Sequence, residues 1–269
     1  MLWCELSAAD FSDSIKKSGS LCILPIGVLE KHGTHLPVGT DMFIVNAIAK
    51  RAAERSEAVV FPYYFLGQIA EARHVQGTIS ASHRLIMDAL LEMCDEIHRN
   101  GFTKILLMNG HGGNSHFLPF FAQQFPGLNR NYGVYTYFSH NMSDDQLMKV
   151  QEKSREMNMG EHAGFLETSL IMYLRPDLVN LKRQDISESK PLKRLSGIDD
   201  KDVFTGFNWY ADYPHHIAGD PSRASAEYGE FIFNILCDNA VSIIDEIKAD
   251  NASGDLISSY EQYTKFYPY

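Results

Sequence analysis

The chain has 269 residues, 45% of them hydrophobic and 22% charged, which is enough apolar material for the core of one globular domain. Its formal net charge of −10, without a Lys/Arg cluster, argues against nucleic acid as a partner. No segment has the roughly 20 apolar residues that span a bilayer, and the N-terminal residues do not resemble a signal peptide. We therefore expect no membrane partner. The four cysteines lack C-x-x-C spacing, so we expect free thiols in a cytoplasmic protein.

Apolar runs and helical patterns alternate along the chain. The runs are short and rich in Val, Ile, Leu and Phe, as in strands buried on both faces of a sheet. The longer segments repeat their apolar residues at helical spacing, and Ser82 and Gly101 stand where a helix cap is expected at either end of one of them. In chain order we expect a strand at 21–27, a helix at 41–55, a strand at 58–63, a helix at 82–100, a strand at 104–108, a helix at 115–124, a strand at 133–138, and helices at 164–174 and 224–249.

This alternation predicts an α/β fold, a three-layer α/β/α sandwich with a largely parallel central sheet. No repeat or shift in composition divides the chain, so we expect one domain over residues 1–269. The polar, irregular stretch at 178–216 is expected near the active site or at a subunit interface. In such folds ligands bind beyond the carboxyl ends of the strands.

The segment from Glu30 to Asp41 places one Glu, two His and one Asp within twelve residues, directly after the first predicted strand. Imidazole and carboxylate together are ligands that divalent transition metals favour. Glu30, His32 and Asp41 are therefore candidate metal ligands. The alternative is a polar surface loop in which Asp41 only caps the following helix.

His111 lies in the turn Asn-Gly-His-Gly-Gly-Asn that ends another predicted strand. Its glycines allow the backbone to bend sharply around the histidine. A glycine-rich turn before a helix could also bind phosphate, but the Lys-Ser/Thr of a P-loop and the G-x-G-x-x-G spacing are both missing. We therefore favour His111 as a further metal ligand.

A third polar cluster, at residues 160–169, adds Glu161, His162 and Glu167. The direction of Glu167 cannot be fixed from the sequence, because it lies about one and a half helical turns after His162. The alternative role for His162 is a residue at a helix start that only hydrogen-bonds a neighbour.

These three motifs resemble those of the creatininase family, the creatinine amidohydrolases. The shared patterns are E-x-H-G-x-H-L-P-x-x-T-D, N-G-H-G-G-N and H-A-G-x-x-E-T-S, and they occur here in the same order. The resemblance implies a metal-dependent hydrolase that assembles as a homo-oligomer, a hexamer. It also implies one or two divalent metal ions per subunit, which could be Zn, Mn or Fe.

Roles carry over to the residues that match these motifs. The resemblance implies that His162 is a catalytic histidine with Glu161 beside it. His35 is expected either to support the metal ligands without binding metal itself or to be structural. It implies that one metal is bound by Glu30, Asp41 and His111 and the second by His32 and Asp41, with Asp41 bridging the two.

The chain also departs from creatininase itself. That enzyme has a glutamate that binds the second metal where this chain has Gly113, so we consider Glu167 as the replacement ligand. Creatininase also uses tryptophans just before its catalytic histidine to enclose the substrate. The only tryptophans here are Trp3 and Trp209, which argues against creatinine as the substrate.

We therefore predict hydrolysis of a non-peptide C–N bond, in an amide, cyclic amide or formamide of a small molecule. Metal-activated hydroxide would attack the carbonyl. His162 would protonate the departing nitrogen, because an imidazole pKa lies near the working pH. Two alternatives remain: hydrolysis of a C–C or ester bond in a cyclic sugar derivative, and a non-catalytic metal-binding protein on the same scaffold.

Overall fold

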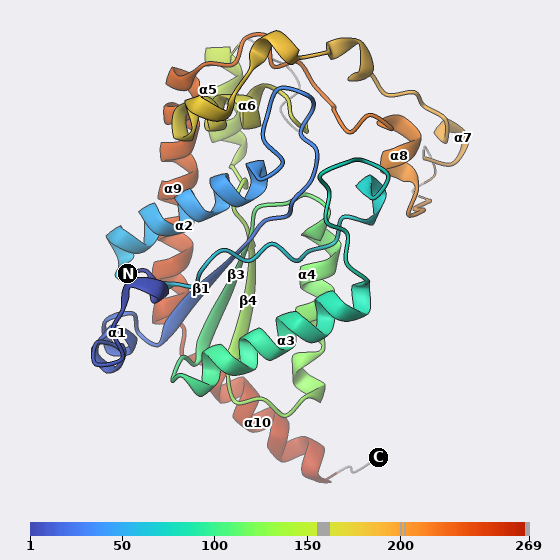
Figure 1. The fold of residues 1–269 in the computed structure, drawn as a ribbon. Helices are drawn as coiled ribbons and strands as arrows, with labels where there is room; N and C mark the ends of the chain where they lie inside the picture. Colours follow the sequence, from blue (N-terminus) through green and yellow to red (C-terminus); the bar gives the residue numbers. More distant parts are fainter. Residues whose placement is uncertain (155–161, 200, 202, 267–269) are drawn as a thin grey trace.

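A four-stranded parallel sheet forms the centre of the computed structural model, which describes residues 1–154, 162–199, 201 and 203–266 (Figure 1). The strand order is β2-β1-β3-β4, and all three neighbouring pairs are parallel. Ile26 pairs with Asn109, so β1 and β3 end at the same edge of the sheet. The predicted α/β fold with a parallel sheet is confirmed. The strands are β1 (Leu21–Ile26), β2 (Val59–Val60), β3 (Lys104–Asn109) and β4 (Gly133–Phe138).

Alternating side chains of the central strands supply two separate cores, one on each face of the sheet. In β1, Leu21 and Ile23 belong to one buried cluster, whereas Cys22 and Leu24 belong to the other. All six residues of β1 are buried, as expected of a strand covered by helices on both sides. The sheet is therefore the middle layer of an α/β/α arrangement.

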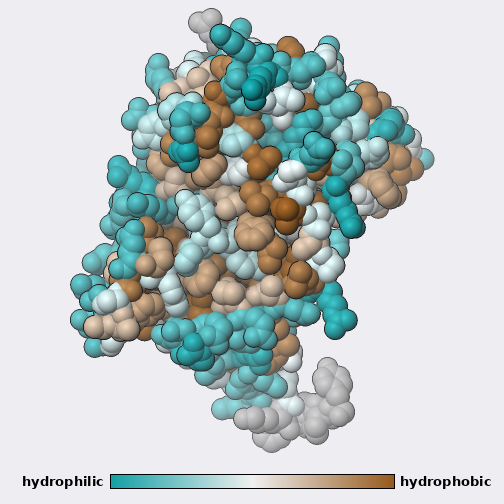
Figure 2. All heavy atoms as spheres, viewed as in Figure 1, coloured by the Kyte–Doolittle hydropathy of each residue, from teal (hydrophilic) through white to brown (hydrophobic). Residues whose placement is uncertain are grey.

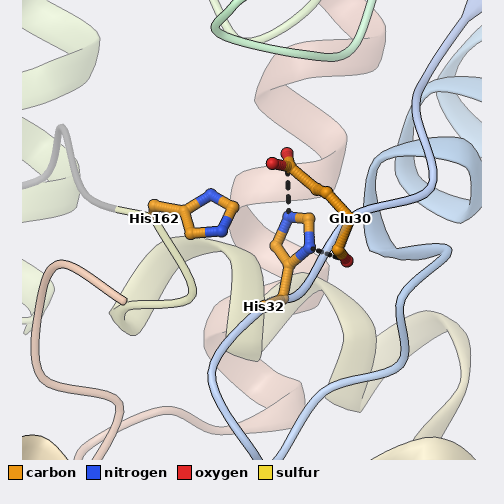
Figure 3. A group of neighbouring side chains, drawn as sticks. All are labelled: Glu30, His32 and His162. Carbon is orange, nitrogen blue, oxygen red and sulfur yellow. Dashed lines mark hydrogen bonds and ion pairs between the residues drawn. The ribbon is translucent and has the colours of Figure 1, made fainter. Parts of the chain in front are cut away.

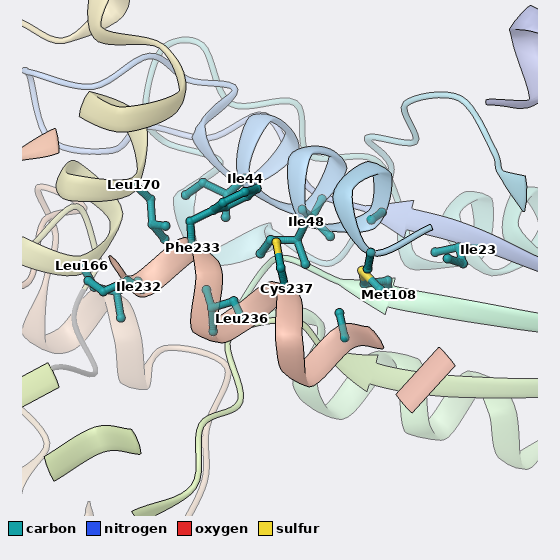
Figure 4. Close-up of a cluster of buried hydrophobic side chains, with 14 of the residues drawn as sticks. Ile23, Ile44, Ile48, Met108, Leu166, Leu170, Ile232, Phe233, Leu236 and Cys237 are labelled. Carbon is teal, nitrogen blue, oxygen red and sulfur yellow. The ribbon is translucent and has the colours of Figure 1, made fainter. Parts of the chain in front are cut away.

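Three helices pack on the face to which Ile23 points: α2 (Thr40–Ser56), α6 (Phe165–Leu174) and α9 (Ala226–Ala249). Their apolar side chains interlock with those of β1 and β3 (Figure 4). Helices α6 and α9 approach closely because Gly229 has no side chain. A Cβ atom there would lie 1.9 Å from the carbonyl oxygen of Ser169. This tight packing fixes α6, whose first turn carries Glu167.

The opposite face is covered by α3 (His83–Arg99) and α4 (Asn114–Gln123), with α1 (Phe11–Lys17) at one end (Figure 1). Ser82 caps α3 as predicted, since its hydroxyl accepts a hydrogen bond from the Leu85 backbone. The buried side of α3 is apolar, and hydrophilic side chains cover its outward surface, low in the view of Figure 2.

The remaining structure is mostly short or peripheral. Helices α5 (Asp144–Ser154) and α10 (Ala252–Phe266) were not predicted from the sequence, and β2 is shorter than the strand expected at 58–63. No helix in the described ranges is long and apolar enough to cross a membrane. Where it is described, the stretch at 178–216 contains short helical segments, including α7 (Ser196–Asp199) and α8 (Asn208–Asp212). Single 3₁₀ turns occupy Trp3–Glu5, Ala70–Ala72, Phe125–Gly127, Pro176–Leu178, Leu181–Arg183 and Ile186–Glu188.

Candidate metal centre

Buried polar side chains from three segments meet where β1 and β3 end. The loop after β1 carries Glu30 and His32, the first turn of α2 carries Asp41, and the turn after β3 carries His111. The structure thus brings together four of the predicted site residues that lie up to 81 positions apart in sequence, each at most 5% exposed. Buried charged groups of this kind are normally paired or bind metals.

His111 completes the first group of possible ligands, together with Glu30 and Asp41. Its Nε2–H donates to the Gln68 carbonyl at 2.9 Å, which directs Nδ1 toward the carboxylates. Nδ1 lies 2.8 Å from Glu30 Oε1 and 3.0 Å from Asp41 Oδ2. One imidazole nitrogen and two carboxylate oxygens therefore converge on a single point.

His32 forms a second group with Asp41 and Glu167. Its Nδ1–H donates to the Glu30 carbonyl at 3.2 Å, so Nε2 is the nitrogen that faces the carboxylates of Asp41 and Glu167. Nε2 lies 3.0 Å from Asp41 Oδ1 and 3.7 Å from Glu167 Oε2. Asp41 belongs to both groups and directs one oxygen to each histidine. Its interpretation as a mere helix cap is wrong, because its side chain makes no capping hydrogen bond and points into this cluster.

Two oxygens of the cluster show that the side chains suit a cation. Glu30 Oε1 and Asp41 Oδ2 are buried, and neither makes a hydrogen bond of normal geometry within the described part of the chain. Both nevertheless lie at contact distance from His111 Nδ1. Buried carboxylate oxygens that converge on one imidazole nitrogen are a set of donors that a bound cation can use, and this mixed N/O set fits Zn, Mn or Fe.

The protonation equilibria of the cluster point to the same preference for positive charge. Burial would raise the pKa of Glu30, but His111 and His162 outweigh it and hold this pKa well below its usual value. Burial would likewise lower the pKa of His32, yet the carboxylates of Asp41 and Glu167 raise it to about 10. Burial raises the pKa of Glu167 to about 7. The surplus of carboxylates stabilises cations at their centre.

His162 lies beside this cluster, in the segment that leads into α6. Its ring is 4.2 Å from that of His32, centroid to centroid, and faces the Glu30 side of the cluster (Figure 3). Its Nε2–H donates to the Lys31 carbonyl at 2.7 Å, so Nδ1 is the nitrogen available to exchange a proton. Burial, reinforced by the nearby His32, lowers the pKa of His162 to about 3. This differs from the near-neutral value expected from the sequence, because the sequence does not show that neighbouring segments enclose much of this partly buried ring. Glu161 lies outside the described residues.

The sequence analysis missed two residues of the site, His216 and Trp209. His216 Nε2 lies 2.5 Å from Glu30 Oε2, and both side chains are buried. The Trp209 indole N–H donates to His216 Nδ1 at 2.9 Å, which places the ring proton on Nε2 and directs it at Glu30. The two residues therefore hold one Glu30 oxygen and leave the other for the cluster. Both lie within the stretch at 178–216, so only its general proximity to the site was foreseeable.

A cavity of about 730 Å³ opens onto the cluster. His162 and Trp209 line it beside the candidate ligands, and Phe138, Met142 and Leu166 supply apolar walls. Its volume suits a small molecule. His162 forms a third group of possible metal ligands with Glu30 and His32. Among the described residues, His35 belongs to none of the three groups, and its Nε2 contacts Thr168 Oγ1 at 2.9 Å instead.

A buried carboxylate–histidine cluster beyond the carboxyl ends of a parallel sheet, open to a substrate-sized cavity, is the arrangement of a metal-dependent hydrolase. The family model for creatininase, creatinine amidohydrolase, matches residues 4–244. The chain therefore belongs to the creatininase family of metal-dependent amidohydrolases, as its motifs predicted.

Individual relatives agree with this assignment. Creatinine amidohydrolase of Pseudomonas putida is 30% identical over 193 residues, covering 66% of this chain and 74% of the relative. The mycofactocin precursor peptide peptidase of Mycobacterium ulcerans is 26% identical over 231 residues, covering 82% and 83%. A manganese creatininase structure superimposes with a TM-score of 0.75 at 24% identity, covering 93% of this chain and 99% of the other, and so shares the fold.

Proposed function

We propose that this protein hydrolyses a C–N bond in a small amide, cyclic amide or formamide, with one or two divalent ions bound at the cluster. The observation that carries the proposal is Asp41, whose two oxygens face His32 and His111 at the same distance of 3.0 Å. A carboxylate in that position can bridge two cations. Bridged two-metal sites are typical of hydrolases.

The proposed ligands form two sets. Glu30, Asp41 and His111 would hold the first ion. Asp41, His32 and Glu167 would hold the second, and Glu167 would replace the glutamate that creatininase has where this chain has Gly113. Its support is the 3.7 Å separation between Glu167 Oε2 and His32 Nε2. When bound, such ions lower the pKa of water and polarise a carbonyl, which is the chemistry that amide hydrolysis requires.

His162 is the proposed proton carrier. With Nε2–H held by the Lys31 carbonyl and a pKa near 3, its Nδ1 is unprotonated at neutral pH. We therefore expect Nδ1 first to accept a proton from the attacking water and then to deliver it to the departing nitrogen. This refines the role expected from the sequence, in which His162 acted only as the acid. Glu161 stays a candidate partner of His162.

The test is hydrolysis by the full chain, first stripped of metal and then reloaded separately with Zn, Mn or Fe. Creatinine, simple formamides, small amides, a matched ester and a cyclic ketone form the substrate panel. We expect release of amine or formate that depends on added metal and on the C–N bond. Turnover limited to the ester or the ketone would favour the alternative chemistry, and stoichiometric metal without any turnover would favour a metal-binding protein. Equal activity in the stripped chain would contradict the proposal.

We also propose that the chain functions as a homo-oligomer, a hexamer, in the cytoplasm. The structure supports only the association of subunits: Phe204 (76%) and Phe207 (69%), three positions apart in the stretch at 178–216, are exposed, and large exposed apolar side chains are typical of interaction surfaces. Light scattering at micromolar concentration should give a mass several times that of the chain. A monomeric mass would contradict this part of the proposal.

A further inference from the structure

A carboxylate outside the proposed ligand sets also lines the cavity. Glu71 lies in the 3₁₀ turn Ala70–Ala72 and shares the cavity with Glu30, Asp41 and His111. Within the described part of the chain, it belongs to none of the three groups that could hold a metal. The proposed ions therefore do not use the Glu71 carboxylate as a ligand.

Glu71 is held in place by the same turn that holds His111. Gln68 Nε2 donates to Glu71 Oε2 at 2.9 Å, and the Gln68 carbonyl accepts the Nε2–H of His111. The Gln68 backbone N–H in turn donates to Asn114 Oδ1 at 2.8 Å. The position of the Glu71 carboxylate is thus tied to that of a proposed metal ligand.

The second oxygen of Glu71 occupies space that Gly113 leaves open. A Cβ atom built at Gly113 would lie 2.9 Å from Glu71 Oε1 and 2.5 Å from His111 Nε2. A glutamate at position 113, as in creatininase itself, would therefore collide with Glu71 or displace it. The absence of a side chain at this position allows a carboxylate from a different segment to face the cavity there.

The charges around the cavity are one-sided. Its described lining residues include four carboxylates, those of Glu30, Asp41, Glu71 and Glu167, and no Lys or Arg. Three of the four belong to the proposed ligand sets, so Glu71 is the carboxylate left for a substrate. A phosphorylated or carboxylated tail would meet it with like charge, whereas an ammonium or guanidinium group would form a charge-assisted hydrogen bond.

We infer that Glu71 determines substrate specificity by binding a cationic group, so that the substrate is a small amide carrying an ammonium or guanidinium group. The inference rests on the proposed function, because it takes the scissile bond to lie at the metal centre. Glu71 would act on binding alone and leave the chemical step unchanged.

The test uses three hydroxamates, whose headgroup chelates divalent metals, with alkyl tails of equal length ending in methyl, ammonium or phosphate. Their dissociation constants are measured on the zinc-loaded full chain, on Glu71→Gln, and on the control Glu230→Gln, which removes an exposed carboxylate of α9. We expect the wild type and the control to prefer ammonium over methyl by about 10–100-fold, the usual scale of hydrogen bonds to charged groups. Phosphate should bind most weakly. Glu71→Gln should reduce the ammonium preference to about twofold and leave zinc content and methyl-tail affinity unchanged.

Three outcomes would overturn the inference. They are an ammonium preference that survives in Glu71→Gln, a phosphate tail that binds the wild type as tightly as the ammonium tail, and loss of zinc in the variant, which would make Glu71 a ligand. If none of the three compounds binds the zinc-loaded wild type, the metal centre itself fails. That result is distinguishable, because it concerns the shared headgroup and not the tails.

Discussion

Replacing Trp209 with Phe removes one hydrogen-bond donor and retains an aromatic ring beside the cavity. The lost N–H is the one that donates to His216 Nδ1 at 2.9 Å, and His216 in turn holds Glu30 Oε2 at 2.5 Å. His216 is only 2% exposed, so water cannot readily replace the indole. The perturbation therefore acts on a proposed metal ligand through a single intermediate ring.

The size of the effect follows from the two states left to His216. If its proton stays on Nε2, then Nδ1 is a buried acceptor without a donor, which costs about 1–3 kcal/mol. If the proton moves to Nδ1, an unprotonated Nε2 faces the Glu30 carboxylate, and the ligand loses its support. Either state weakens the hold of His216 on Glu30, a proposed metal ligand. We therefore expect a loss of metal affinity of about 10–100-fold, as for other hydrogen-bond partners of metal ligands.

The assay is competition for zinc between the protein and a chromophoric chelator. Trp3→Phe is the matched control, because Trp3 packs against Phe11, Phe61 and Phe102 in an aromatic cluster of the other core. That variant should lose stability but keep its zinc affinity. A zinc dissociation constant within about twofold of the wild type in Trp209→Phe would refute the reasoning.

Further substitutions test the other parts of the account. Glu167→Gln should lower the metal content by about one ion per subunit, measured by elemental analysis. Asp41→Asn should remove metal and activity together. Unchanged metal content in both variants would contradict a site in which Asp41 bridges two ions. His162→Ala should lower turnover by roughly 10²–10⁴-fold with metal content intact, and metal loss would instead make His162 a ligand. Burial opposes the ionisation of Asp95, but hydrogen bonds from Arg130 and Tyr132 outweigh this effect and lower the pKa of Asp95. The Asp95 carboxylate therefore stabilises the folded state at pH values above the unfolded-state pKa of about 3.9. Asp95→Asn should therefore cost about 1 kcal/mol in urea unfolding at pH 7, and the difference should shrink as the pH falls through the lowered pKa; a constant difference down to pH 2 would contradict this assignment.

Local patterns were sufficient for most of the sheet and its covering helices. The apolar run at 21–27 became β1, and the helical spacing at 82–100 became α3 with Ser82 as its cap. Helix α5 was missed because its sequence, DDQLMKVQEKS, offers few apolar residues from which to read a period. The strand at 58–63 was overestimated: β2 ends at Val60, although the Phe61 backbone N–H still donates to the Ile23 carbonyl of β1.

The candidate site likewise has a part that could be predicted from the sequence and a part that could not. Glu30, His32 and Asp41 lie within one short motif, and the motif itself pointed to metal. His216 lies 186 positions from Glu30, and its role depends on which ring nitrogen faces the carboxylate. Glu71 has no motif around it, and only the open space beside Gly113 shows that it faces the cavity. Contacts between distant segments of this kind could not be read from residue spacing.

Anomalous diffraction from crystals of the full chain, grown with zinc or manganese and measured at the absorption edge of the metal, would show directly whether the cluster binds metal ions. We predict one or two peaks at about 2.0–2.3 Å from side-chain atoms of the cluster, with Asp41 contacting each peak. The His111 contact should be through Nδ1 and the His32 contact through Nε2. A fully loaded protein whose peaks lie elsewhere, away from Glu30, Asp41 and His111, would contradict the account.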